Sequence, residues 1–115
     1  GMIDEGRTLL AVDYSLALDW TEVLNSALDR IFDRYDAIVT PATTGEAPVG
    51  LTTTGDPVFC TIWTYCGVPA ITLPLLQGEN GLPVGVQLVG RRGGDARLLR
   101  TASWLMRRFG IVTPQ

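Results

Sequence analysis

The two cysteines are among the most reactive side chains of this chain, and their spacing argues against a shared site. Cys60 and Cys66 are six residues apart, which matches neither a redox C-x-x-C pair nor the spacing of a metal-binding pair. On a helix they would lie about 9 Å apart along the axis, which is too far for a disulfide. We therefore interpret both as buried, small apolar residues.

The side chains that most often act as general bases or metal ligands are missing. The 115 residues include no histidine and no lysine, and all nine cationic residues are arginine. Ser15, Ser26 and Ser103 are the only serines, and each lies inside a predicted helix. A serine nucleophile needs an adjacent base, and histidine and lysine are both absent. Acidic residues are scattered over helix surfaces. We therefore expect no catalytic residue, no metal site and no cofactor.

A glycine-rich turn at residues 90–95 is a candidate anion site, because it joins a predicted strand to a helix. It reads Gly-Arg-Arg-Gly-Gly-Asp, which is neither G-x-G-x-x-G nor a P-loop. Asp95 would also place a carboxylate where the anion should lie. A turn followed by a helix cap is the simpler interpretation.

Three further side chains are candidates for either packing or binding. Phe59 and Trp63 share one face of a predicted helix, and at this spacing aromatic residues more often belong to a core than to a pocket. Gln87 lies in a predicted central strand, where burial would oblige its amide to find hydrogen-bond partners on both sides. We expect those bonds to be structural.

The amino-terminal third has a helical pattern over residues 8–34. A stripe of apolar residues repeats at three- and four-residue steps: Leu16, Trp20, Val23, Leu24, Ala27, Leu28, Ile31 and Phe32. One long helix covering a core is the favoured interpretation. A break near Asp19, where residues 19–22 could form a capping box, is the alternative.

The remaining elements are shorter. Residues 37–40 predict a strand, residues 41–55 a long loop, and Asp56 with Pro57 the start of a helix that Gly67 ends. Apolar runs at 70–73 and 84–89 predict an antiparallel hairpin, and Asp95 begins a last helix. The order α-β-α-β-β-α predicts a single α/β domain over residues 1–115, in which helices cover a small mixed sheet.

Composition narrows the functional classes. The chain is 46% apolar with a net charge of −3 and no basic patch in its first two thirds, which does not favour nucleic-acid binding. No apolar run is long enough for a membrane helix, and no signal peptide is visible. Gly1 before Met2 is typical of a tag-cleavage scar. We expect a cytoplasmic protein.

Five motifs together resemble the carboxyl-terminal part of the amidase signature hydrolases, which include bacterial amidases and the A subunit of glutamyl-tRNA amidotransferase. The likeness lies in residues 35–42, 55–59 with Trp63 and Thr64, 67–74, 81–90, and Asp95 with Leu98, Leu99, Ala102 and Leu105. It implies a partial amidase signature fold and, in the parent family, hydrolysis of carboxamides through two serines and a lysine. Those catalytic residues belong to an earlier Gly/Ser-rich segment that has no counterpart here.

The resemblance also sets the expectations for site and partners. It implies that side chains near Phe59 and Trp63 adjoin the acyl-binding pocket, and Trp63-Thr64 is closer to the simple amidases than to the tRNA enzymes. The chain by itself is expected to be inactive, and to pair either with a second copy as a homodimer or with the missing catalytic half. The alternative is a self-standing, non-catalytic α/β module for assembly or binding.

Overall fold

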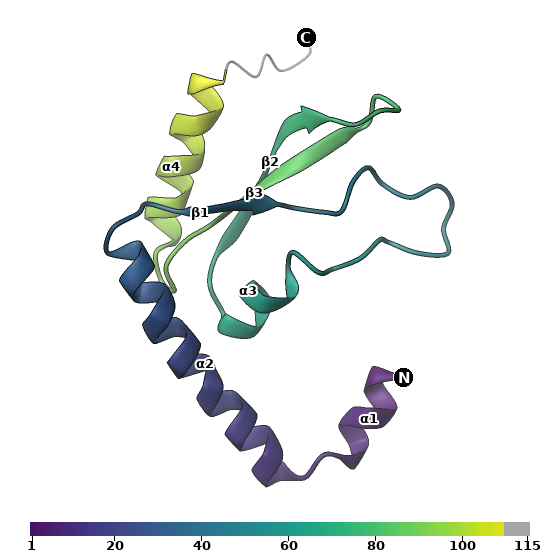
Figure 1. Cartoon of the computed structure of the whole chain (residues 1–115), viewed down its shortest axis with the longest axis vertical. Coiled ribbons are helices and arrows are strands. Elements are labelled where there is room, and N and C mark those ends of the chain that lie inside the picture. Colours follow the sequence, from purple (N-terminus) through teal and green to yellow (C-terminus); the bar gives the residue numbers. More distant parts are fainter. Residues whose placement is uncertain (110–115) are drawn as a thin grey trace.

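The computed structural model describes residues 1–109. Four helices and three strands follow one another along the chain (Figure 1). In order they are α1 (Met2–Thr8), α2 (Ala11–Phe32), β1 (Ile38–Pro41), α3 (Thr61–Cys66), β2 (Ala70–Gln77), β3 (Pro83–Val89) and α4 (Asp95–Arg108). Among these residues, no helix combines the length and the apolar content that crossing a membrane demands.

The three strands form one sheet in the order β1-β3-β2. Both neighbours run antiparallel to β3, so that Leu88 lies opposite Val39 on one side and Ile71 on the other. The expected α/β class, with helices on an antiparallel hairpin, is confirmed. The sheet is antiparallel throughout rather than mixed, because the two outer strands run in the same direction and β3 runs against both.

The central strand β3 is buried on both faces because its side chains alternate between two cores. Val89 joins Phe32, Cys66 and Val68 beneath α2 and α3. Leu88 points to the opposite face, where the core under α4 comprises Leu73, Leu88, Leu98 and Ala102. Helices thus cover both sides of a very small sheet (Figure 1).

The amino-terminal helix differs from its expected form. The break lies at Leu9 and Leu10, whose extended backbone separates α1 from α2, and Asp19 continues inside an unbroken α2. The prediction of a single apolar stripe along this helix is also wrong. Leu24, Leu28 and Phe32 pack into the core, whereas Leu16 and Trp20 are 57% and 62% exposed. The three- and four-residue spacing predicted one apolar face, whereas the apolar residues lie on two faces of the helix.

The helix expected to start at Asp56 begins at Thr61 instead. Oδ1 of Asp56 does accept the amide of Val58 at 3.0 Å, as a cap would. The chain then makes a tight turn in which the amides of Cys60 and Thr61 both donate to the carbonyl of Pro57. Gly67 ends the helix as expected, with a left-handed backbone (φ 66°).

Candidate functional site

The cleft

The long segment between β1 and α3 extends beyond the sheet and returns (Figure 1). Its two limbs enclose a cleft of about 470 Å³ that also reaches β2 and β3. The lining residues are mostly small: Ala42, Thr43, Thr44, Gly45, Glu46, Ala47, Pro48, Thr54, Gly55, Asp56, Cys60, Thr72, Pro83 and Gly85. The loop to which the sequence assigned no regular structure is therefore the wall of a hollow.

Gln87 holds the two ends of this segment together. Its side chain is buried, and its Nε2 donates to Thr40 Oγ1 at 3.0 Å and to the carbonyl of Phe59 at 2.8 Å. The Cys60 sulfur lies 3.7 Å from Oε1 of Gln87 and 3.6 Å from the carbonyl of Ala42. The expected structural bonds are thus present, and they join the strand before the loop to the turn after it.

Glu46 fixes the loop to the β2–β3 hairpin. Its Oε1 accepts the backbone amides of Asn80 (2.8 Å) and Leu82 (3.2 Å), and its Oε2 accepts the side-chain amide of Asn80 at 2.8 Å. The hydrogen bond from the Asn80 side chain, aided by the backbone amides, holds the pKa of Glu46 below its ordinary value. The carboxylate therefore closes the outer end of the cleft.

Gly85 forms the floor of the cleft because no side chain fits there. A Cβ at this position would lie 2.2 Å from Cγ2 of Thr72 and 3.1 Å from Cβ of Ala42. The amide of Ala42 donates to the Gly85 carbonyl at 3.0 Å, which extends the β1–β3 pairing by one residue into the cleft. A glycine thus keeps the floor flat where three segments meet.

The expected site residues

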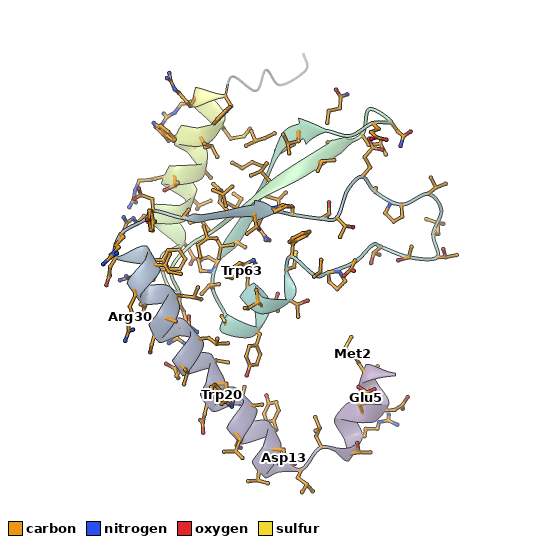
Figure 2. All side chains as sticks on the ribbon, viewed as in Figure 1. Met2, Glu5, Asp13, Trp20, Arg30 and Trp63 are labelled. Carbon is orange, nitrogen blue, oxygen red and sulfur yellow. The ribbon has the colours of Figure 1, made fainter. Side chains whose placement is uncertain are left out.

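Neither Phe59 nor Trp63 is among the residues that line this cleft. Phe59 is half-buried beside the cleft and contributes its carbonyl to Gln87. Trp63 packs against the core formed by Phe32, Cys66, Val68 and Val89, and Figure 2 shows it between α3 and the sheet. Its position agrees with the core interpretation of the sequence pattern.

The two cysteines have different environments, and both are free thiols. Cys66 is buried as expected, and burial raises the pKa of its thiol. Cys60 is half-buried and faces the cleft. Its place there escaped sequence reasoning because the helix expected to contain it begins one turn later than its start signals predict.

The arginines of the glycine-rich turn bind carboxylates of α2. Arg92 makes a two-pronged pair with Glu22, at 2.8 and 3.1 Å, and this hydrogen-bonded pair lowers the pKa of Glu22. Arg91 pairs with Asp33 and donates to the Asp29 carbonyl at 2.9 Å. These contacts agree with a structural turn, because both guanidinium groups bind α2. The expected helix cap is wrong, since Gly94 is the N-cap of α4, Asp95 is its first residue, and no side chain caps it.

The residues that line the cleft do not pair a nucleophile with a base. Its lining offers threonine hydroxyls, backbone groups and one thiol, without a cation among the residues that form it. A nucleophile needs a base within hydrogen-bond reach, and the sequence contains neither histidine nor lysine. Its two carboxylates, Glu46 and Asp56, already accept amide hydrogens. The lining is therefore acidic, with no cation to balance it.

Comparison with known proteins

The Amidase family matches residues 2–99, which is most of the chain. This chain belongs to the amidase family. Two curated relatives are the A subunit of glutamyl-tRNA(Gln) amidotransferase from Roseobacter denitrificans (41% identical) and the putative amidase AmiB2 of Mycobacterium bovis (37% identical). The matches cover 86% and 70% of this chain, but only 22% and 20% of those relatives.

A solved structure shows that the amidase likeness extends to the fold. A crystal structure of an amidase superposes with a TM-score of 0.73 at 30% identity, covering 92% of this chain and 27% of that one. The chain thus spans about a fifth of the length of its curated amidase relatives and about a quarter of the solved structure. It has the fold of one segment of an amidase.

Proposed function

We propose that this chain forms the carboxyl-terminal part of an amidase that hydrolyses carboxamides, and that the catalytic residues come from an earlier segment. The family match over residues 2–99 carries the proposal. The sequence contains no lysine, and its three serines at 15, 26 and 103 all lie within α2 or α4. The chemistry therefore needs groups from outside these 115 residues.

The contribution of this segment would be one wall of the substrate site. The cleft between the loop and β3 has two carboxylates and no cation, so it disfavours anions and is compatible with the neutral acyl part of a carboxamide. Phe59 and Trp63 adjoin the turn that closes the cleft. We assign them an indirect role, in which Trp63 supports α3 and Phe59 supplies the carbonyl that orients Gln87.

An activity measurement tests the proposal. We expect the purified chain to release no ammonia from acetamide, benzamide or glutamine, because hydrogen-bond donors alone do not replace a nucleophile. Turnover is expected when the chain is mixed with the Roseobacter denitrificans relative expressed without the region that this chain matches. That truncated relative by itself is the control.

Two results would contradict the proposal. Hydrolysis by the purified chain that survives repurification would show a catalytic group within it. Failure of the mixture, and of a fusion of the two parts, to exceed the truncated relative would instead favour a non-catalytic assembly or binding module. That second function is also consistent with a cleft in which no nucleophile is paired with a base.

We also propose that the chain pairs with itself when no other segment is present. The strands β1 and β2 are both edges of the sheet, and Val39 on β1 is 63% exposed. Unpaired strand edges offer backbone donors and acceptors to another copy. A two-fold pairing is the commonest way to cover such surfaces.

A further inference from the structure

The helix α2 carries apolar side chains on two faces. Leu24, Leu28 and Phe32 point into the core. At 100° per residue, a second row is centred roughly 120° further around the helix. Val12, Leu16, Trp20 and Val23 form this row, which we call the outer face, and they are 57–62% exposed. A helix that is apolar over so much of its circumference is typical of one buried between two layers.

The outer face continues toward the amino terminus, along an arm that comprises α1 and the first half of α2. Leu9 and Leu10, which connect the two helices, are 61% and 65% exposed, and no residue of α1 is buried. The arm touches the body through the Tyr65 hydroxyl, which donates to the carbonyl of Ala17. Figure 2 shows Trp20 on α2, away from the sheet. The arm thus presents a long, uncovered apolar surface.

The surface area of the molecule reflects its open shape. The chain exposes 8900 Å², whereas a compact monomer of 12.4 kDa exposes about 6,100 Å². Its radius of gyration is 17.1 Å, against about 13 Å for a compact chain of this length. The excess of about 2,800 Å² belongs to all protruding parts of the chain, the loop between β1 and α3 as well as the arm, and Val49 and Leu51 in that loop are fully exposed. The open shape therefore agrees with an arm that lacks a cover.

The solved amidase points to an occupant. It covers 92% of this chain, so most of the arm superposes on it. The matched segment accounts for only 27% of that amidase, so most of the enzyme lies outside it. The arm has not folded back to cover its own apolar residues.

We propose that the outer face of α2 is the docking surface for the catalytic segment of the amidase. This inference rests on the proposed function. Leu16 and Trp20, at the middle of the face, are the central contacts, and Val12 and Val23 extend it along the helix. The catalytic segment covers this face with a large apolar surface of its own. It thereby holds the substrate cleft in a fixed place relative to the nucleophile.

Binding in solution tests the surface. The probe is the Roseobacter denitrificans relative expressed without its matched region, titrated into the fluorescently labelled chain and followed by sedimentation velocity. A Leu16→Glu, Trp20→Glu variant is expected to bind at least ~10-fold more weakly, because the complex would bury unpaired carboxylates. Leu99→Glu is the matched control, since Leu99 is a 58% exposed leucine on another helix. Both variants should keep the thermal midpoint of the free chain.

The possible outcomes separate the proposed docking surface from the proposed function. The proposal that the outer face is the docking surface is overturned if the wild type and the double variant bind the probe equally. It is also overturned if the wild type does not bind the probe. If the wild type is a dimer that the probe does not dissociate, and the double variant is a monomer, the occupant is a second copy instead. Variant-sensitive binding without restored hydrolysis supports the surface but contradicts the proposed function. Restored hydrolysis that ignores both substitutions contradicts the surface alone.

Discussion

At the scale of single residues, one amide does most to shape the candidate site. Gln87 donates to Thr40 and to the carbonyl of Phe59, and it accepts a weak contact from the Cys60 thiol. The three partners belong to segments that flank the long loop. The side chain therefore determines where the loop leaves the sheet and where it returns.

Substituting Gln87 by leucine is expected to lower the free energy of unfolding by about 1–3 kcal/mol, because the Phe59 carbonyl loses its donor. Urea unfolding at neutral pH measures this loss. Labelling of Cys60 by a thiol reagent should become faster, since the thiol loses its contact with the amide. An unchanged labelling rate would show that the loop stays in place without Gln87.

Gln87→Glu adds a test by pH. A buried carboxyl has a pKa raised above its unfolded value, because burial disfavours the charged form. The variant is therefore expected to be least stable at neutral pH and to recover as the pH falls through the raised pKa. Stability that instead declines steadily into acid, in parallel with the wild type, would contradict a buried environment.

For Glu46 we expect the opposite dependence of stability on pH. Its pKa is lowered in the folded chain by Asn80 and the hairpin amides, so its contribution is complete above the unfolded pKa and is lost as the pH falls through the lower, folded value. We expect the protection of the Asn80 and Leu82 amides, measured as their exchange rate relative to unfolded amides at the same pH, to fall in that acidic range. Glu46→Gln should show low protection at every pH, and Glu79→Gln is the control on the same turn.

At the scale of elements, the sequence located the strands but not all of their ends, and it did not separate the helix faces. Alternation along residues 84–89 indicated the second strand of the hairpin. The first strand was expected to end before Pro74, whereas β2 continues to Gln77 because an irregularity between Leu73 and Leu76 accommodates the proline within the pairing. The apolar row of α2 was ambiguous, because residues such as Leu16 and Leu28 satisfy the same spacing whether they face the core or a partner. Only the three-dimensional arrangement separates them.

The site was harder to predict than the fold. Its wall is an irregular segment, in which Glu46 finds its partners 34 and 36 residues away. No periodic pattern encodes a contact of that kind. Gln87 was recognisable because a polar residue in a central strand requires partners, whereas Asn25, which donates to the carbonyl of Cys66 at 2.8 Å, gave no such signal on a helix.

The placement of α3 is expected to depend on Trp63. Trp63→Ala should lower the free energy of unfolding by about 3 kcal/mol, because the indole leaves a void beside Phe32 and Val89. Trp104→Ala is the matched control, since Trp104 is 57% exposed on α4 and its replacement should cost less than about 0.5 kcal/mol. Equal losses in thermal or urea unfolding would contradict the core assignment of Trp63.

At the scale of the whole molecule, the chain is thin and open, with extents of 53 × 41 × 19 Å. One dimension is barely the thickness of a helix packed on a sheet. A chain of this shape has few residues that are far from solvent, which agrees with its small core of nine buried apolar side chains among the described residues.

Such a chain is expected to dimerise when purified alone. Light scattering at micromolar concentration, with any tag removed, should give twice the 12.4 kDa of one copy. A mass near 12.4 kDa would rule the dimer out. A monomer could arise if the loop of residues 41–55 folded over the bare surface. That arrangement would need a different loop position, because Glu46 attaches the loop to the hairpin turn.

The attachment of the long loop at three places has a consequence for how its length could vary. Gln87 holds both ends of the loop, and Glu46 attaches its first limb to the hairpin, so residues 47–55 are the part that lies between attachments. Changing the length of this part costs little, since the entropy of closure grows only with the logarithm of the length. We expect an exchange of residues 47–55 to leave the rest of the fold intact.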